Sequence, residues 1–388
     1  MKALDFTKKY ALYLINRNNR RDKNIWVFGE WFGKRTGDNC THFANFVADH
    51  DPDIELYWMC TNQCDVSELD ERIHIVHFSS DDCRKILKQA GVVLMGEGIS
   101  DLNEGIINYC GNAIKVNLWH GIMWKKIGDD TKTGKGASFL DRIRDKMYAY
   151  DVFETPSDEY TQHILTGFRA GNKRFIKAGL PRNRLFYQTE QIEKCREKVL
   201  DKVGRKAKYI ISYLPTFRDN TTDTFSFGDI KDAVFEKWME DHDVIIIQKA
   251  HFTGNKQFSG ENDRIIIMND ISAQELMAAS DMLVTDYSSC FFDYLILDRP
   301  IIHHLYDYEY FRNKDRGLYY EKDKIVCGCV TETNEELIKE IMDEYDHPEK
   351  YKNVRKERKK QFMTYESQNS CEKIYNWLKA EAEKRDKQ

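Results

Sequence analysis

The stretch Ser280-Asp-Met-Leu-Val-Thr-Asp-Tyr-Ser-Ser-Cys-Phe-Phe-Asp-Tyr-Leu295 has the pattern of a buried strand that leads through a tight turn into a helix. Its apolar run, Met282–Thr285, has the length of a strand, and the helix is expected to begin at about Ser288. A strand followed by a helix is the repeating unit of parallel α/β proteins, in which both faces of the sheet are covered. The stretch therefore predicts a buried parallel strand within such a fold.

The same alternation of apolar runs and helical patterns continues on both sides of this stretch, in two series. In the first series, strands are expected at 24–28, 55–60, 73–78, 92–95, 115–119 and 150–154. In the second series, strands are expected at 209–214, 244–249, 264–268, 282–285 and 300–303. Helices are expected between them, at 39–49, 81–89, 158–168, 190–203, 230–240 and 273–279. The pattern predicts an α/β protein with two Rossmann-like, doubly wound domains.

The turn Ala178-Gly-Leu-Pro-Arg-Asn-Arg184 indicates where one domain gives way to the next. The expected parts are an N-terminal domain at 1–178, a C-terminal domain at 179–365 and a terminal helix at 366–388. Such domains bind their ligand at the carboxyl ends of the strands, in the cleft between them. Nucleotide-sugar transferases of the GT-B type have this layout, so GT-B is the expected fold class, although a fold alone does not define a function.

The composition is that of a folded protein and excludes several classes. Of 388 residues, 41% are hydrophobic and 32% are charged, and the formal net charge is −5. These values argue against a disordered chain and against a basic nucleic-acid-binding protein. No apolar run approaches ~18 residues and the N-terminus lacks the features of a signal peptide, so a cytosolic-type soluble chain is expected. The ten cysteines show no CxxC or zinc-finger spacing, so reduced thiols are expected.

Common catalytic motifs are absent from the sequence. It contains no P-loop, no HExxH, no GxSxG, and no GxGxxG after the first strand,. Asp51-Pro52-Asp53 has the spacing of a metal-binding carboxylate pair, but it precedes its strand and Pro52 suits a turn. We therefore expect no metal ion and no cofactor.

Two serines in the opening stretch are candidate ligands of an anion. Ser288 and Ser289 would lie in the first turn of the helix, where free backbone N–H groups and the helix dipole favour a phosphate. The alternative is ordinary capping of the helix by serine.

Two further strands of the second series end in polar residues that suit a pyrophosphate. Lys249 and His251 come at the end of an apolar strand and would lie on the same side of it; an exposed loop is the alternative. Thr216 and Arg218 follow the strand that Pro215 ends, and arginine binds phosphate through paired hydrogen bonds. The alternative there is a turn with a surface ion pair.

In the first series, His120 lies where a strand gives way to Gly121. Glycine allows a sharp turn and the close approach of another group. The ordinary pKa of histidine lies near neutrality, so His120 is a candidate general base. The alternative is a histidine that only packs beside Trp119.

Taken together and in this order, the segments resemble the CDP-glycerol glycerophosphotransferase family, the enzymes that build the polyol-phosphate chains of teichoic acids and related capsules. The resemblance rests on Asp38-Asn39, Trp119-His120-Gly121, Lys125-Lys126-Ile127-Gly128, Gly179-Leu-Pro-Arg182-Asn183, Leu214-Pro-Thr216-Phe-Arg218, Lys249-Ala-His251, Thr285-Asp286-Tyr-Ser288-Ser289 and Phe292-Asp293. One departure, Ile122-Met123-Trp124 in place of Thr-Pro-Leu, concerns the acceptor side.

The resemblance implies phosphoryl transfer by a GT-B enzyme without a metal. A hydroxyl of the acceptor attacks the β-phosphorus of CDP-glycerol, or of CDP-ribitol as the alternative, and CMP leaves. Such chemistry depends on positioning and on neutralising charge at the phosphate oxygens. The implied catalytic residues are His120 and His251. The implied donor-binding residues are Arg182, Thr216, Arg218, Lys249, Thr285, Asp286, Ser288, Ser289 and Asp293. The implied acceptor-side residues are Asp38, Asn39, Trp119, Lys125 and Lys126.

The family's acceptor is a lipid-linked saccharide, so the resemblance implies a cytoplasmic enzyme at the inner membrane surface. Phe6, Tyr10, Tyr13 and Leu14 would share one helical face among basic residues, as in a helix that lies in a membrane surface; a helix packed on the first sheet is the alternative. A second basic stretch follows in the same domain, formed by Lys132, Lys135, Arg142, Arg144 and Lys146. Oligomerisation is left open.

Two other functions remain open from the sequence. One is a GT-B glycosyltransferase that uses a sugar nucleotide, with His120 as the base. The other is a catalytically silent nucleotide-binding scaffold, although such a module would need no base. Release of CMP, as opposed to a nucleotide with free sugar, would separate these readings.

Overall fold

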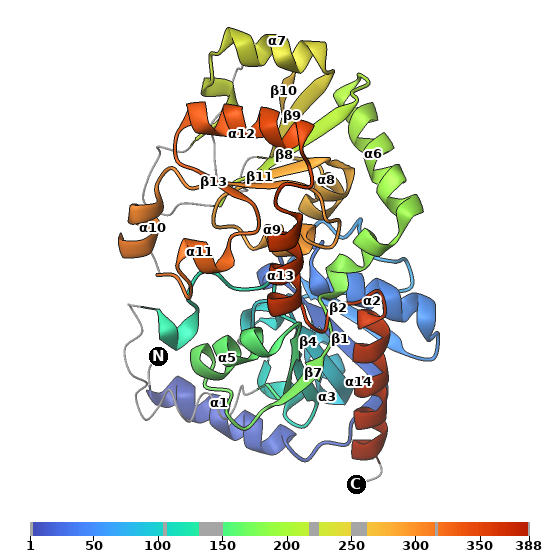
Figure 1. The fold of residues 1–388 in the computed structure, drawn as a ribbon. Coiled ribbons are helices and arrows are strands. Elements are labelled where there is room, and N and C mark those ends of the chain that lie inside the picture. Colours follow the sequence, from blue (N-terminus) through green and yellow to red (C-terminus); the bar gives the residue numbers. More distant parts are fainter. Residues whose placement is uncertain are drawn as a thin grey trace. The chain divides into compact units, whose positions relative to one another are not determined.

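The computed structural model describes residues 3–103, 107–131, 150–216, 225–249, 262–314 and 317–386. The chain forms two compact units (Figure 1). Unit 1 comprises residues 1–121, 135–184 and 365–388, and unit 2 comprises 122–134 and 185–364. The change from one unit to the other at 184/185 comes a few residues after the expected boundary at 178/179. One segment differs from the expectation, because 122–134 belongs to unit 2; the terminal helix, expected as a part of its own, belongs to unit 1.

Unit 1 is built on a parallel sheet that, in the described part of the chain, has seven strands in the order β3-β2-β1-β4-β5-β6-β7. The strands are β1 (Asp22–Gly29), β2 (Glu55–Cys60), β3 (His74–His77), β4 (Ala90–Met95), β5 (Ile114–Asn117), β6 (Val152–Thr155) and β7 (Arg174–Lys177). The first six were expected. The edge strand β7 was missed because its sequence, Arg-Phe-Ile-Lys, offers one buried apolar residue and no continuous apolar run.

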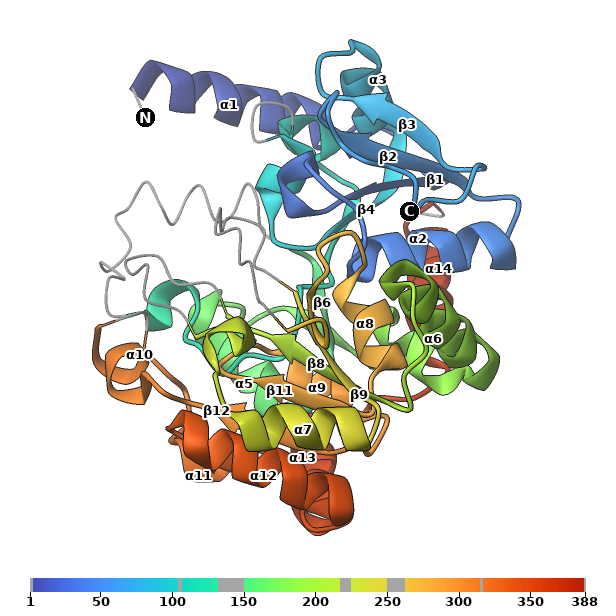
Figure 2. The same ribbon diagram turned by 90° about the horizontal axis from the view of Figure 1, so that it is seen from above.

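Helices cover both faces of this sheet, as its apolar strands require. On one face, Trp26 and Phe28 of β1 pack with Phe43 of α2 (Asn39–His50) and Leu378 of α14 (Ser370–Asp386), and α2 and α14 lie side by side (Figures 1 and 2). On the other face, the core includes Leu87 of α3 (Asp82–Gln89) and Cys110 of the short helix η3 (Ile107–Cys110). The unit also contains α1 (Ala3–Asn16) and α5 (Asp158–Gly167).

Unit 2 contains a second parallel sheet, with the described strands in the order β10-β9-β8-β11-β12-β13. The strands are β8 (Tyr209–Leu214), β9 (Val244–Gln248), β10 (Ile265–Ile267), β11 (Met282–Thr285), β12 (Ile301–His304) and β13 (Cys329–Thr331). The quoted stretch thus forms a central strand, as predicted. The short edge strand β13 was missed.

Helices also flank the second sheet. Phe235 and Trp238 of α7 (Ala233–Asp241) and Leu337 and Ile341 of α12 (Asn334–Asp346) join the core on one face (Figure 2). The other helices of the unit are α6 (Thr189–Val203), α8 (Ala273–Ala279), α9 (Cys290–Tyr294), α10 (Tyr308–Lys314), α11 (Lys322–Ile325) and α13 (Lys352–Phe362). The charged run in α13 is not wholly solvated, because Arg355 is buried and its Nε donates to Asp298 Oδ1 at 3.0 Å.

Each sheet has one point at which the strand order reverses. In unit 1, β1 has β2 on one side and β4 on the other; in unit 2, β8 lies between β9 and β11. Connections diverge there and leave room at the carboxyl ends of the strands, which is where ligands bind in open α/β sheets. Among the described residues, no helix is long and apolar enough to cross a membrane.

Candidate active site

His120 lies just beyond the carboxyl end of β5, at the expected sharp turn. Trp119 has a φ of 46° and Gly121 a φ of 141°, a region that favours glycine at the second position. The Trp119 N–H donates to Asn117 Oδ1 at 2.7 Å, which holds the turn. The His120 side chain is 35% exposed, but its Nδ1 atom is buried. Nε2 is therefore the ring nitrogen that a substrate can reach.

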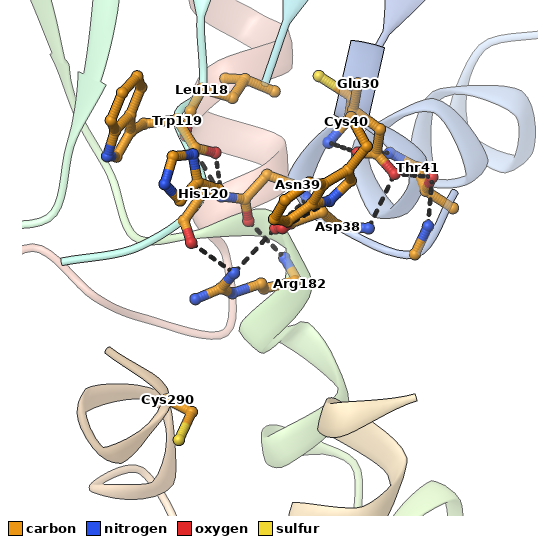
Figure 3. Close-up of polar contacts among 12 residues, drawn as sticks. Glu30, Asp38, Asn39, Cys40, Thr41, Leu118, Trp119, His120, Arg182 and Cys290 are labelled. Atoms are coloured by element: carbon orange, nitrogen blue, oxygen red, sulfur yellow. Dashed lines mark hydrogen bonds and ion pairs between the residues drawn. The ribbon is translucent and has the colours of Figure 1, made fainter. Parts of the chain in front are cut away.

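The backbone around His120 is fixed by Asn39, the first residue of α2. Its side-chain amide donates to Leu118 O at 3.2 Å and to Trp119 O at 2.8 Å (Figure 3). The Trp119 ring stacks on the imidazole with ring centroids 4.3 Å apart. Of the residues expected on the acceptor side, Asp38, Asn39 and Trp119 thus gather around His120.

Arg182 also belongs to this cluster, which differs from its expected place in the donor site. Its Nη1 donates to Asp38 Oδ1 at 2.9 Å and to His120 O at 2.8 Å, and its backbone N–H donates to Asn39 Oδ1 at 3.2 Å (Figure 3). Arg182 and Asp38 are both buried. The contacts tie the guanidinium to the base and to the start of α2.

A buried carboxyl that the sequence analysis did not consider, Glu30, holds the start of α2. Its oxygens accept from the backbone N–H groups of Asp38, Cys40 and Thr41 at 2.9, 3.1 and 3.2 Å, and from the Thr41 hydroxyl at 2.6 Å. Burial, followed by the charge of Asp38, raises the pKa of Glu30 to about 8. Glu30 is therefore mainly protonated at neutral pH.

Two more carboxyls, the half-buried Glu97 and the buried Asp101, follow β4. Glu97 Oε1 lies 3.8 Å from His120 Nδ1. Asp101 accepts from the backbone N–H groups of Phe32 at 2.8 Å, Glu97 at 2.8 Å and Gly98 at 2.9 Å. Burial, followed by the charge of Asp101, raises the pKa of Glu97 to about 10.

The sequence contains a signal for these residues that went unused. Val27-Phe-Gly-Glu30 and Leu94-Met-Gly-Glu97 are the same apolar run closed by Gly-Glu. The two runs are β1 and β4, which pair in parallel with Gly29 opposite Met95. A repeated Gly-Glu at the ends of strands therefore marks the point in unit 1 where the strand order reverses.

The corresponding point in unit 2 brings together the residues that follow β8 and β11. The Thr216 N–H donates to Asp286 Oδ1 at 2.8 Å, and the Thr285 hydroxyl donates to Leu214 O at 2.7 Å. Thr216, Thr285 and Asp286 are buried. These three expected donor-site residues thus lie at one site.

Ser288 and Ser289 are half-buried beside this site, before the helix that was expected to contain them. That helix, α9, begins at Cys290 and has five residues, and Ser289 makes no side-chain capping bond. The helix dipole of so short an element is small, so the two hydroxyls remain the main donors here. Asp293 lies within α9 and is buried.

Lys249 follows β9 as expected, but its ammonium contacts backbone. Its Nζ donates to Asn269 O at 2.9 Å and to Ile271 O at 2.5 Å. Arg218, His251 and the basic stretch at 132–146 lie outside the described residues.

Lys125 and Lys126, expected on the acceptor side, belong to unit 2. Lys125 forms an antiparallel bridge with Leu318, and the Lys126 N–H donates to Gly317 O at 2.9 Å. Trp124 Nε1 donates to Tyr320 O at 2.9 Å in the same pairing. Residues 124–126 thus pair with residues 317–320 within unit 2. The sequence near Lys125 and Lys126 contains no sign of a partner segment so far along the chain.

The carboxylate pair at 51–53 has a structural role. Asp51 follows α2 and accepts from Tyr375 Oη at 2.5 Å and from Lys379 Nζ, both on α14. Among the described residues, no group of three or more His, Cys, Asp or Glu side chains is placed to hold a metal ion.

Comparison with known proteins decides the family. The family model of the CDP-glycerol:poly(glycerophosphate) glycerophosphotransferases matches residues 11–379. The chain belongs to this family. The match covers both sites described above, and it confirms the resemblance carried by the sequence motifs.

Curated relatives of this family member act in teichoic acid synthesis. A teichoic acid poly(glycerol phosphate) polymerase of Bacillus spizizenii is 31% identical over 252 residues, which cover 59% of this chain and 61% of the relative. A teichoic acid glycerol-phosphate transferase of Staphylococcus aureus is 24% identical over 330 residues, which cover 82% of this chain and 83% of the relative. The chain therefore matches about three fifths of the Bacillus polymerase and most of the Staphylococcus transferase.

Solved structures support the fold of the family member. The wall teichoic acid polymerase TagF has a TM-score of 0.81 at 19% identity, over 98% of this chain and 94% of that one. A putative UDP-N-acetylglucosamine 2-epimerase from Listeria monocytogenes has a TM-score of 0.55 at 11% identity, over 94% of this chain and 98% of that one. The expected GT-B fold class is confirmed.

Proposed function

We propose that the protein transfers glycerol phosphate from CDP-glycerol to a hydroxyl of a lipid-linked saccharide or a growing polyol-phosphate chain. The observation that carries the proposal is the family match over residues 11–379, which includes His120 in unit 1 and the Thr216–Asp286 site in unit 2. TagF structures that include a variant soaked with CDPG support the choice of donor. Unit 1 would bind the acceptor and unit 2 the donor.

His120 Nε2 would accept the proton of the attacking hydroxyl. The hydroxyl oxygen forms a bond to the β-phosphorus, the bond from that phosphorus to the bridging oxygen breaks, and CMP leaves with the electron pair. The exposed edge of the imidazole and the buried Nδ1 support this role. Positioning of a base of suitable pKa contributes about 10²- to 10⁴-fold to such reactions.

The donor would bind at the point in unit 2 where the strand order reverses. The half-buried hydroxyls of Ser288 and Ser289 would donate to the pyrophosphate, beside Thr216, Thr285 and Asp286. Lys249, Arg218 and His251 would add positive charge, and Asp293 of α9 would contact the ribose hydroxyls or orient a neighbouring side chain. Arg182 is better suited to holding His120, because its guanidinium is committed to Asp38 and the His120 carbonyl.

The first experiment measures CMP release from CDP-glycerol and from CDP-ribitol, each with and without a lipid-linked disaccharide, in EDTA. We expect release from CDP-glycerol that depends on the acceptor. CDP-ribitol is included because the relatives include a teichoic acid ribitol-phosphate primase. Release from CDP-ribitol alone would change the proposed donor but keep the proposed reaction class. No release from either donor would refute the proposal and favour a sugar nucleotide.

We also propose that α1 brings the enzyme to the cytoplasmic face of the membrane. Tyr10, Leu14 and Ile15 are 39, 44 and 70% exposed, and basic residues such as Lys8, Arg17 and Arg20 are exposed near them. Apolar and basic side chains on one helix suit an interface with anionic lipids. Arg21 is not part of this surface, because its guanidinium donates to Leu87 O, Asn16 O and Tyr109 O.

Flotation with vesicles tests the membrane proposal. The wild type should float with vesicles that contain anionic lipid, and a Leu14→Ser, Ile15→Ser variant should remain in solution. Val234→Ser serves as the matched control, since Val234 is 71% exposed in unit 2. Equal flotation of all three proteins would refute the role of α1.

A further inference from the structure

A buried oxygen of Glu97 faces the imidazole of His120. Glu97 Oε1 is buried and accepts no hydrogen bond from the described residues, and it lies 3.8 Å from His120 Nδ1. The other oxygen, Oε2, accepts the backbone N–H of Trp31. One oxygen is thus anchored to the backbone, while the other points to the buried nitrogen of the base.

The turn after β1 holds Glu97 in this orientation. Trp31 and Phe32 have φ values of 47° and 58°, a left-handed conformation that costs roughly 1–2 kcal/mol for each residue other than glycine. The turn persists because its N–H groups donate to buried carboxyls, that of Trp31 to Glu97 and that of Phe32 to Asp101 at 2.8 Å. Strain that the surroundings maintain is characteristic of functional sites.

The neighbouring carboxyls are committed elsewhere. Glu30 accepts four hydrogen bonds at the start of α2, and Asp38 is paired with Arg182 at 2.9 Å. Asp101 accepts three backbone N–H groups and also shares a side-chain hydrogen bond with Glu97, whose Oε1 atom is not part of that bond. Glu97 is therefore the carboxyl in this cluster with an oxygen left for His120.

We propose that Glu97 is a positioning residue for His120. Its Oε1 accepts the Nδ1 proton of the imidazole, which leaves Nε2 unprotonated and able to take the proton of the attacking hydroxyl. A gap of 3.8 Å in the absence of substrate agrees with this role, because catalytic hydrogen bonds often shorten only in the substrate complex. The role resembles that of the carboxyl group which sets the histidine tautomer in catalytic triads. The assignment rests on the function proposed for His120.

The ionisable groups around the pair keep Glu97 neutral before the reaction. Those that face Glu97 and His120 from the surrounding elements are Glu30, Asp38, Cys40, Asp101, Tyr150 and Arg182. Most of them are acids, and burial with the charges of Asp101 and Asp38 raises the pKa of Glu97 to about 10. A neutral Glu97 can still accept the Nδ1 proton through Oε1. A neutral Glu97 does not form an ion pair with His120, so it does not favour the protonated imidazole.

The test reads the tautomer of His120 directly by ¹⁵N NMR of histidine-labelled protein, with the signal assigned by its loss in His120→Ala. In the wild type, neutral His120 should carry its proton on Nδ1. In Glu97→Ala, the proton should move mainly to Nε2. Glu97→Gln should lie between them, because its amide oxygen can replace one acceptor. Glu71→Gln, an exposed glutamate of the same unit, is the matched control and should match the wild type.

Kinetics give the second readout. The kcat for CMP release should fall about 10- to 100-fold in Glu97→Ala, as for other residues that orient a catalytic histidine, with the KM for CDP-glycerol within about twofold. An unchanged tautomer in both Glu97 variants would overturn the proposal even if activity fell. If the wild type released no CMP, the proposed function would fail, while the NMR comparison would still decide the role of Glu97.

Discussion

In unit 1, the strands that flank the reversal point, β1 and β4, lead into Gly29-Glu30 and Gly96-Glu97, and Glu30 is buried while Glu97 is half-buried. In unit 2, Thr216 follows β8, Thr285 ends β11 and Asp286 follows it, with two half-buried serines beside them. The first site surrounds the candidate base His120 with Glu30, Glu97 and Asp101, whose pKa values are raised by burial. The second offers hydroxyl and N–H donors of the kind that bind phosphate. In our proposal, one chain uses the same position in two similar sheets for proton transfer and for anion binding.

Loss of the base should have the largest effect. His120→Ala should lower kcat by about 10²- to 10⁴-fold and leave the affinity for CDP-glycerol unchanged, because the proposed donor site lies in unit 2. Turnover is measured as CMP release and affinity by calorimetry. His74→Ala, an exposed histidine of β3, is the control. Unchanged turnover in His120→Ala would show that His120 is not the base. The contrast between a proton-transfer site in unit 1 and an anion-binding site in unit 2 would then fail.

The buried ion pair of unit 1 should have the next largest effect. In Arg182→Met, the buried Asp38 would lose its ion-pair partner, so the free energy of unfolding of unit 1 should fall by about 3–5 kcal/mol,. Arg72→Met is the matched control: Arg72 pairs with Asp49 and Asp70 on the surface, where such pairs contribute about 0–1 kcal/mol,. Urea unfolding followed by hydrogen exchange in α2 measures both. Equal losses would mean that the Arg182 pair does not stabilise unit 1.

The hydroxyls of unit 2 should show the opposite kinetic pattern to the base. A hydrogen bond to a charged group contributes about 1.5–3 kcal/mol, so Ser288→Ala and Ser289→Ala should each raise the KM for CDP-glycerol by about 10- to 100-fold with little change in kcat. Ser79→Ala, an exposed serine of unit 1, is the control. A fall in kcat at constant KM would assign these serines to the chemical step. Donor binding and chemistry would then not be separated between unit 2 and unit 1.

The sequence predicted the central strands of both sheets because short, continuous Val/Ile-rich runs are typical of buried parallel strands. β2, β8 and β11 begin and end where the pattern placed them. The edge strands β7 and β13 were missed, since each has a short sequence with few buried apolar residues. Edge strands are held mainly by backbone hydrogen bonds, and these leave no mark on the sequence.

A residue could be proposed for the candidate site where its type itself carries the chemistry, as with His120, and that role stays a prediction. No such proposal was possible where the role depends on a partner distant in the chain. Arg182 could be assigned to phosphate from its chemistry alone, and only the fold places it on Asp38, 144 positions away in the sequence. Glu97 was overlooked because a lone glutamate after a strand usually faces solvent.

The smallest expected effect is the pH dependence of unit 1. Glu30 has a pKa of about 8 in the fold against an ordinary 4.5, so the folded state keeps a proton that the unfolded chain releases. Unit 1 should therefore lose stability as the pH rises from ~5 to ~8. Glu30→Gln has no proton to lose, so its decrease should be smaller by on the order of 1–3 kcal/mol.

Hydrogen exchange in β1 and α2, corrected for the intrinsic pH dependence of exchange, measures this difference. Amides of β8 and β9 in unit 2 should respond alike in the wild type and in Glu30→Gln, and Glu71→Gln controls for the loss of an exposed carboxyl. An equally steep decrease in Glu30→Gln would move the titrating proton from Glu30 to the Glu97–Asp101 pair. The carboxyls that titrate would then be those that follow β4, next to His120. Glu30, which follows β1, would have no part in the pH dependence.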